Sequence, residues 1–138
     1  MATSDSPNGT ARYVFRVRFR VEPSQPELSV EPAEFETTLY RAADPPGVDG
    51  WLFFRDYLWR GEIGDEAYFR GIAEDALGVS VVSISFSELQ TDQAYLDALR
   101  EAIGTQLGEF NAKTVDEALK KYLGSSIHVG IRDDHQDR

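Results

Sequence analysis

Residues 50–61 read Gly50-Trp51-Leu52-Phe53-Phe54-Arg55-Asp56-Tyr57-Leu58-Trp59-Arg60-Gly61, and the rest of the chain must pack against them. The segment holds both tryptophans of the chain, two of its eight phenylalanines and one of its six tyrosines. Aromatic side chains bury about 150–250 Å² each and dominate the energetics of cores and interfaces. We therefore expect this segment, with the ring of Trp59 included, to be part of the hydrophobic core.

The local structure of this aromatic segment is ambiguous. Its rings favour a strand, but apolar and polar residues alternate poorly along it. Asp49 is a suitable N-cap for a helix, and Gly61 is a suitable residue to end one. The pattern favours a short helix, with a strand as the alternative.

Three charged residues stand inside or beside the aromatic run, namely Arg55, Asp56 and Arg60. An unpaired buried charge costs several kcal/mol, so each needs a partner. One interpretation is that these residues and Glu62 line a polar pocket walled by Trp51 and Trp59, in which the arginines bind a carboxylate or phosphate. The other interpretation is a structural ion-pair network that holds the segment in place, which is the more common role of such residues.

The clearest strand lies upstream of the segment. Apolar residues alternate with arginines between Tyr13 and Val21, which predicts one face in the core and a basic stripe of Arg16, Arg18 and Arg20 on the other. Residues 22–33 contain three prolines and predict a loop, with an extended edge piece at residues 28–30 as an option. Residues 34–40 predict a second strand. If the two strands pair antiparallel, we expect Arg20 near Glu36.

The basic stripe suggests anion binding. Arginines two apart on a strand project in parallel about 7 Å apart, which is close to the spacing of successive phosphates. The alternative is cross-strand pairing with Glu34 and Glu36 on a solvated sheet face. Neutralising about four phosphates gives a salt slope near −3.6, so going from ~0.15 to ~3 M salt would cost roughly 4–5 decades of affinity. Nucleic-acid binding in high salt would need stacking, for example on an exposed Tyr40.

Downstream of the segment the patterns predict three helices and two strands. Helices are expected over residues 65–77, ended by Gly78, over residues 92–110, and after a capping box of Thr114 with Glu117. Strands are expected over residues 79–86 and at residues 127–131. Gly104 and Gly108 weaken the long helix by about 1 kcal/mol each relative to alanine, or allow another backbone to approach closely.

These elements predict an α+β fold, a small and mainly antiparallel sheet with helices packed on one face. A ferredoxin-like plait fits poorly because two strands precede the first helix. We expect a single domain over residues 11–131, between disordered tails at residues 1–10 and 132–138.

The charge composition predicts a halophilic protein. The net charge is −10, and only three of the 14 basic residues are lysines. An acidic surface with few lysines keeps a protein soluble in molar salt, where charges are screened within about 3 Å. The same charge argues against membrane surfaces and against bulk attraction to nucleic acid. No long apolar run or signal sequence is present, so we expect a soluble cytoplasmic protein.

The sequence carries no catalytic, metal-binding or cofactor-binding motif. There is no cysteine, and neither a G-x-G-x-x-G nor a P-loop pattern. His128 lacks a nucleophile elbow, since residues 124–130 are not G-x-S-x-G. Acidic residues at 62–75 do not have the spacing of a calcium loop and are expected everywhere in this composition. We predict no catalytic residue, no metal and no cofactor.

A resemblance to a known family begins at Gly50-Trp51-Leu52-Phe53-Phe54-Arg55-Asp56 and continues through Leu58-Trp59-Arg60-Gly61-Glu62. This stretch resembles the small haloarchaeal proteins called LWR-salt proteins. The resemblance extends from about Phe15 to Val129 and takes in Lys121-Tyr122-Leu123-Gly124-Ser125-Ser126-Ile127-His128-Val129. It implies a halophilic archaeal source. It implies no activity, ligand or catalytic residue.

For function, we first predict a non-enzymatic interaction module that binds another protein or itself through aromatics beside the central segment. The alternative is a binder of a small anion or of nucleic acid, through Arg16, Arg18 and Arg20 or through Arg55 and Arg60. An enzyme of unknown class is a further alternative.

Overall fold

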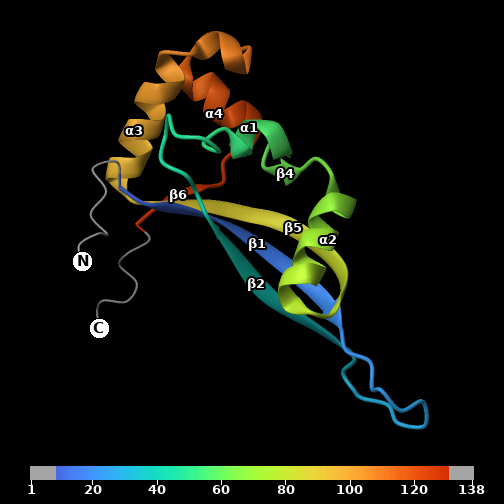
Figure 1. Cartoon of the computed structure of the whole chain (residues 1–138). Helices are drawn as coiled ribbons and strands as arrows, with labels where there is room; N and C mark the ends of the chain where they lie inside the picture. The colour runs from blue at the N-terminus through green and yellow to red at the C-terminus, as the bar shows by residue number, and fades with distance from the viewer. Residues whose placement is uncertain (1–8, 131–138) are drawn as a thin grey trace.

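A computed structural model of the chain describes residues 9–130. The elements are β1 (Ala11–Arg20), β2 (Glu34–Ala42), α1 (Phe53–Tyr57), β3 (Leu58–Trp59), β4 (Glu62–Ile63), α2 (Glu66–Leu77), β5 (Ser80–Thr91), α3 (Gln93–Gly104), the 3₁₀ turn η2 (Leu107–Phe110), α4 (Val115–Leu123) and β6 (Ile127–Val129). The main sheet has the order β2-β1-β5-β6, and only β6 runs parallel to its neighbour. The helices lie on one side of this sheet (Figure 1), which confirms the predicted α+β fold.

The strand β1 is the centre of the sheet, because it pairs antiparallel with both β2 and β5. The register between β1 and β2 places Arg20 opposite Glu34 and Arg18 opposite Glu36. The expected proximity of Arg20 to Glu36 is therefore wrong by two residues along β2. The sequence pattern also ended β5 too early, because the strand continues past Phe86 to Thr91 with two register shifts against β1.

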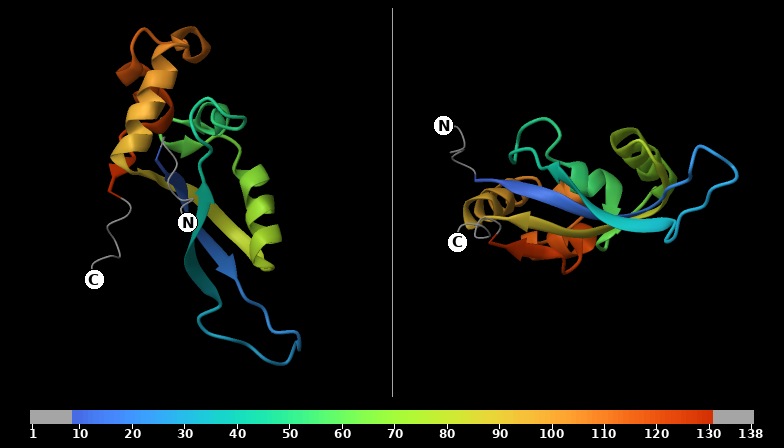
Figure 2. Two further views of the ribbon diagram at one scale, coloured as in Figure 1. Left: turned by 60° about the vertical axis from the view of Figure 1, so that its left-hand side comes forward. Right: turned by 90° about the horizontal axis from the view of Figure 1, so that it is seen from below.

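The core lies between the sheet and the helices. On β1 the side chains of Tyr13, Phe15 and Val17 are buried on the helix side, as the alternating pattern predicted. The opposite face of the sheet carries the arginines and is not covered by a helix (Figures 1 and 2). The long loop between β1 and β2 projects beyond the end of the sheet, and residues 28–30 form no strand in it.

The aromatic segment is part helix and part strand. The helix α1 begins after Leu52 without a side-chain cap, so the predicted capping role of Asp49 is wrong. The helix ends at Tyr57, and Leu58–Trp59 then forms a small hairpin with Glu62–Ile63. The rings of this segment bind the layers together. The Phe53 ring lies 4.6 Å from the Tyr13 ring on the sheet, and the Phe54 ring stacks at 5.8 Å on Phe110 of η2.

The local capping signals of two helices are confirmed. The carboxylate of Asp65 accepts a hydrogen bond from the backbone N–H of Tyr68, and Gly78 ends α2 in the left-handed conformation. The Thr114 hydroxyl accepts from the N–H of Glu117 at the start of α4. In contrast, the predicted helix over residues 92–110 is wrong in its length. The helix α3 stops at Gly104, and the chain turns before η2.

The predicted tails at residues 1–10 and 132–138 lie almost wholly outside the described residues. Within the described range, the backbone N–H of Thr10 donates to a carboxylate oxygen of Asp92 at 3.0 Å. This bond ties the start of β1 to the N-cap of α3.

Candidate functional site

The tripeptide Leu58-Trp59-Arg60 forms a tight turn against the end of α4. Leu58 is buried in the core, whereas Arg60 and Gly61 both have positive φ angles, of 54° and 81°. This is the backbone shape of a two-residue hairpin turn, and it joins β3 to β4. The N–H of Arg60 donates to the carbonyl of Lys121 at 2.8 Å, and the N–H of Gly61 donates to that of Tyr122 at 2.9 Å. The turn therefore caps carbonyls in the last turn of α4, which have no partner within the helix.

Two glycines allow this close contact. A Cβ on Gly124 would come within 3.0 Å of the Arg60 carbonyl oxygen, and a Cβ on Gly61 within 3.1 Å of the Leu123 oxygen. Both residues also have positive φ angles. The hairpin and the end of α4 thus meet backbone to backbone, and they hold Trp59 at a fixed place.

The Trp59 side chain lies on the surface. It is 49% exposed, so the expectation that this ring is in the core is wrong. The ring meets Tyr122 at 5.8 Å in an edge-to-face arrangement. The Arg60 guanidinium carbon and the Lys121 Nζ both lie over this ring, 5.8 Å and 6.0 Å from its centre, at the outer limit of cation–π contacts. We call the open hollow here the Trp59 groove. It has a volume of about 660 Å³ and is lined by Trp59, Arg60, Glu117, Lys120, Lys121, Gly124 and Ser125.

The other residues predicted for this pocket have a structural role. Trp51 is buried against Phe54 and Phe110 and does not line the Trp59 groove. Arg55 forms ion pairs with Asp56 at 2.9 Å and with Glu109 at 3.1 Å. The hydrogen bond to Asp56 is the main cause that raises the pKa of Arg55. The first pair lies within α1, and the pair with Glu109 links α1 to η2. Together they form the ion-pair network that the sequence offered as the alternative to a pocket.

The arginine stripe of β1 is on the open sheet face, but its members differ in their partners. Arg20 pairs with Glu34 at 2.6 Å. Arg12, which precedes the stripe, stacks 4.0 Å above the ring of Tyr40 and bonds to Gln90. Arg16 and Arg18 are exposed, and neither has a carboxylate within ion-pair distance among residues 9–130. The pairing explanation thus applies to Arg20 and not to its two neighbours.

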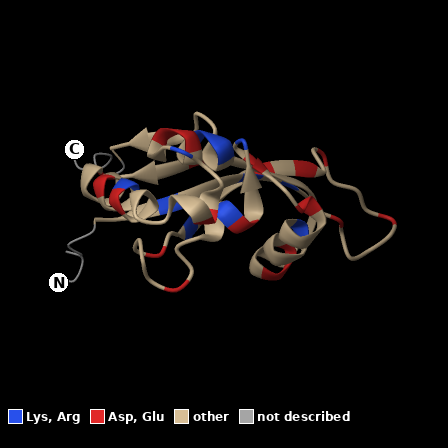
Figure 3. Cartoon of the chain, turned by 90° about the horizontal axis from the view of Figure 1, so that it is seen from above, with Lys and Arg blue, Asp and Glu red and all other residues tan. Residues whose placement is uncertain are grey.

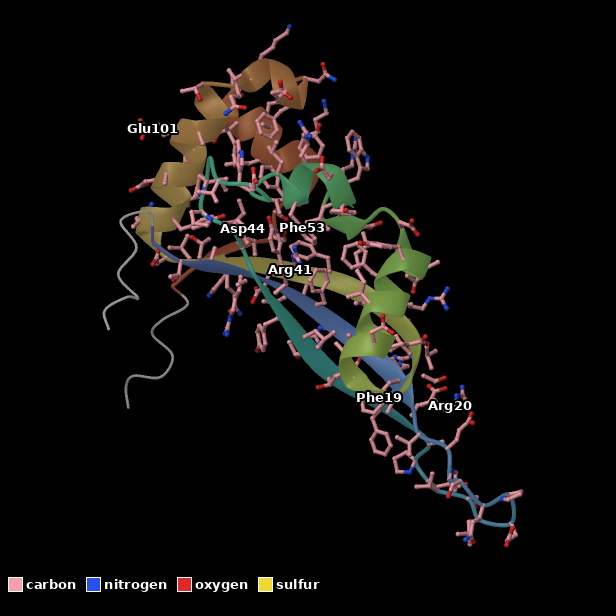
Figure 4. The ribbon with its side chains drawn as sticks, in the orientation of Figure 1. Phe19, Arg20, Arg41, Asp44, Phe53 and Glu101 are labelled. Atoms are coloured by element: carbon pink, nitrogen blue, oxygen red, sulfur yellow. The ribbon has the colours of Figure 1, made fainter. Side chains whose placement is uncertain are left out.

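A second hollow, which we call the aromatic cleft, lies between β2 and α2. It encloses about 280 Å³ and is lined by Phe15, Leu39, Tyr40, Arg41, Phe53, Tyr57, Tyr68, Phe69, Ile72, Ala73, Ala76 and Ile84. The Arg41 guanidinium lies over the Phe53 ring at 4.5 Å (Figure 4). The exposed rings of Tyr57 and Tyr68 stack at 5.8 Å, and repulsion between their two phenolates is the first cause that raises the pKa of Tyr57.

Sequence reasoning did not find the aromatic cleft. The one available signal was Ile72, an apolar residue within the predicted helix over residues 65–77. In the structure Ile72 is 44% exposed and borders the cleft. The rest of the cleft depends on which strand is at the edge of the sheet, and no local pattern contains that information.

The strand β2 forms a free edge of the sheet next to this cleft. It has nine residues, contains neither lysine nor proline, and pairs with β1 without a bulge. Proteins commonly protect edge strands by those three devices. The strand does carry the charged residues Glu34, Glu36 and Arg41, which also discourage edge pairing. Its length and straightness nevertheless leave a row of backbone groups that can pair with another strand.

The described residues contain neither a metal-binding cluster nor a membrane-spanning helix. No group of three or more acidic or histidine side chains in residues 9–130 is arranged to hold a metal ion. In the same range no helix has the length and apolar character required to cross a membrane.

Comparison with known proteins identifies a family. The family model described as LWR-salt protein matches residues 9–133. No curated protein and no solved structure matches the chain.

Proposed function

The chain belongs to the LWR-salt protein family, and we propose that it is a non-enzymatic interaction module of a halophilic cytoplasm. We propose further that its partner is a second copy of itself, which pairs along the free edge of β2. The observation that carries this proposal is the long edge of β2, which has no proline, lysine or bulge, beside the aromatic cleft.

The direction of the backbone groups on β2 supports this proposal. Just beyond the two ends of the strand pair, Val21 donates to the Ala33 oxygen at 2.9 Å and Ala43 donates to the Ala11 oxygen at 3.0 Å. In an antiparallel ladder such hydrogen-bonded pairs recur at every second residue. The odd-numbered residues of β2 therefore bond to β1, and the N–H and C=O groups of Glu36, Thr38 and Tyr40 point away from the sheet.

A symmetric antiparallel pairing suits this edge. If the two-fold axis passes through Thr38, all nine residues of each strand overlap. Glu36 then stands opposite the partner's Tyr40, and the half-exposed Phe35 stands opposite the partner's Arg41. No like charges face each other in this register, and like charges directly opposite would be destabilising.

The charge of the protein makes this association depend on salt. Each copy carries a net charge of −10, so two copies repel each other in dilute buffer. At about 1 M salt the screening length is about 3 Å, and the repulsion is largely removed. Pairing in molar salt and separation in dilute salt is thus the expected behaviour of a halophilic homodimer.

The test is a proline on the outward-facing position of the edge. Thr38→Pro removes an N–H that is not bonded to β1, so the monomer should keep its fold. In 3 M KCl we expect a dimer for the wild type and for Thr38→Val, which keeps the N–H, and a monomer for Thr38→Pro. Sedimentation equilibrium measures the mass, and circular dichroism checks the fold of each variant. A wild type that is monomeric at ~1 mM in 3 M KCl would overturn the proposal.

A second candidate function is favoured by Arg16 and Arg18, which are exposed and have no acidic partner in the described chain. These arginines, with Arg20 beside them, suit an anion on the open sheet face. The test is retention on immobilised RNA at ~50 mM salt. This function is supported if the wild type is retained and an Arg16→Glu/Arg18→Glu/Arg20→Glu variant is not. Absence of retention by the wild type would exclude it.

A further inference from the structure

Trp59 is an exposed ring on a rigid base. Its backbone is in a hairpin whose turn bonds to the Lys121 and Tyr122 carbonyls, and its ring packs on Tyr122, yet about half of the side chain is open to solvent. Burying this ring in the core would have been the ordinary use of a tryptophan. A large aromatic surface that is both exposed and held in place is suited to stacking with a planar ligand.

The charges around this ring are unusual for the chain. The protein has only three lysines, and two of them, Lys120 and Lys121, line the Trp59 groove together with Arg60. Among residues 9–130 none of the three cations is in a salt bridge. The one carboxylate that lines the groove, Glu117, accepts a hydrogen bond from the Lys113 N–H at 3.0 Å.

Helix capping does not account for all of these cations. Basic residues in the last turn of a helix often stabilise its free carbonyls. Here the Arg60 and Gly61 N–H groups already bond to the Lys121 and Tyr122 carbonyls. The Lys121 Nζ is directed elsewhere, to the carbonyl oxygens of Phe110 and Asn111 at 3.1 and 3.0 Å. The side chains of Arg60 and Lys120 have no such partner within the described residues.

We propose that the Trp59 groove binds a mononucleotide. The base would stack on the indole of Trp59, and the phosphate would lie beside Arg60 and Lys120. The Arg60 guanidinium lies over the Trp59 ring, 5.8 Å from its centre. A stacked base would replace this cation–π contact, and the displaced guanidinium would stay close enough to bind the phosphate that a sugar joins to the base. The groove volume of about 660 Å³ lies within the range of small-ligand sites. Stacking is not screened by ions, so this site can work in molar salt where a purely ionic one fails.

The two tryptophans supply the test. Trp51 is buried, so quenching of the fluorescence by a stacked base reports on Trp59. In 1 M KCl we expect saturable quenching by adenosine monophosphate, weaker binding of adenosine, and no quenching by inorganic phosphate. We expect a short oligoadenylate to bind no better than the mononucleotide, because the groove recognises a single base and its phosphate. Binding that increases with the length of the oligoadenylate would overturn the proposed ligand class in favour of a nucleic-acid strand.

Variants separate the groove from the open sheet face. Arg60→Asn/Lys120→Gln removes two cations, and asparagine tolerates the positive φ of position 60. We expect this variant to bind adenosine monophosphate about three- to tenfold more weakly, as two exposed charge contacts are modest. Arg18→Gln removes one cation from the sheet face and should leave the affinity unchanged. The absence of saturable quenching by the wild type, or an equal loss in Arg18→Gln, would overturn the proposal.

Discussion

Trp51 and Trp59 have opposite environments because of the parts of the chain that meet each ring. Trp51 is 7% exposed, with the rings of Phe54 and Phe110 at 6.3 and 6.1 Å. Trp59 stands directly before the turn that caps α4, and the turn directs its ring to the surface. Since α4 forms from residues far along the chain, no pattern near Trp59 indicates that its ring is exposed.

This difference predicts unequal costs of truncation. Trp51→Ala leaves a cavity in the core and should lower the free energy of unfolding by about 3–5 kcal/mol. Trp59→Ala removes a half-exposed ring and its contact with Tyr122, and should cost less, about 1–2 kcal/mol. Urea unfolding of both variants in 3 M KCl measures the two values. Equal losses would mean that Trp59 is buried, for example in an interface, under those conditions.

The charged residues of the segment show what sequence reasoning could and could not decide. The chain order placed Arg55 and Asp56 in an apolar run, which suggested ion pairs, and the two residues do pair although Asp56 is exposed. It gave no means of finding Glu109, because η2 meets α1 only in the folded state. The predicted pocket therefore divides into a buried tryptophan with an ion-pair network, and a surface groove around Trp59.

At the scale of elements, those with local signals were predicted well. The period-two pattern of β1 and the caps of α2 and α4 are properties of a few adjacent residues, and the structure confirms them. The long helix was wrong because its ending depends on tertiary contact. Phe110 has to reach the ring of Phe54, 5.8 Å away, and this contact competes with a helix that two glycines already weaken.

Close contact between backbones also involves other glycines than the sequence suggested. Gly104 and Gly108 were candidates for an approaching backbone, but a Cβ on Gly104 would meet only the side chain of Val115, and a Cβ on Gly108 would meet nothing within 4 Å. The close contact is between Gly124 and the hairpin turn at Arg60. Glycine alone does not show which backbone it faces.

Two glycine-to-alanine substitutions should therefore change the free energy of unfolding in opposite directions. Gly124→Ala puts a Cβ 3.0 Å from the Arg60 oxygen at a φ of +64°, so it should destabilise the fold by more than about 1 kcal/mol. Gly71→Ala lies within α2 with nothing within 4 Å, and it should stabilise the fold by about 0.5–1 kcal/mol. Urea unfolding compares the two. A neutral Gly124→Ala would contradict the proposed contact between the turn and α4.

At the scale of the whole molecule, charge is the dominant feature. Acidic residues lie along the length of the chain, including the loop between β1 and β2, where residues 21–33 hold three glutamates and no basic residue (Figure 3). The sequence alone gave this net charge of −10. It did not give the order of the strands, so the open sheet face and the free edge of β2 were found only in the structure.

The net charge predicts how stability depends on salt. Like charges repel more in the compact state than in the unfolded chain, and screening should relieve most of this repulsion by ~0.5 M KCl, where the screening length is about 4–5 Å. Above that concentration, exclusion of salt from the surface strengthens apolar burial. We expect the melting temperature to rise steeply below ~0.5 M KCl and then more slowly to ~3 M.

The matched control changes charge at three exposed positions. Glu22, Glu27 and Glu101 have no hydrogen-bond or ion-pair partner for their side chains within the described residues. Each Glu→Lys exchange adds two charges, so the triple variant goes from −10 to −4. The steep low-salt part of the melting curve should flatten in this variant, because it reports on repulsion between charges. The shallow high-salt part should remain, because it reports on apolar burial, which the three exchanges leave alone. If the melting temperature of the wild type is constant from ~0.05 to ~3 M KCl, the proposal that the protein is halophilic is contradicted. There would then also be no reason to expect the β2 edge to pair only in salt.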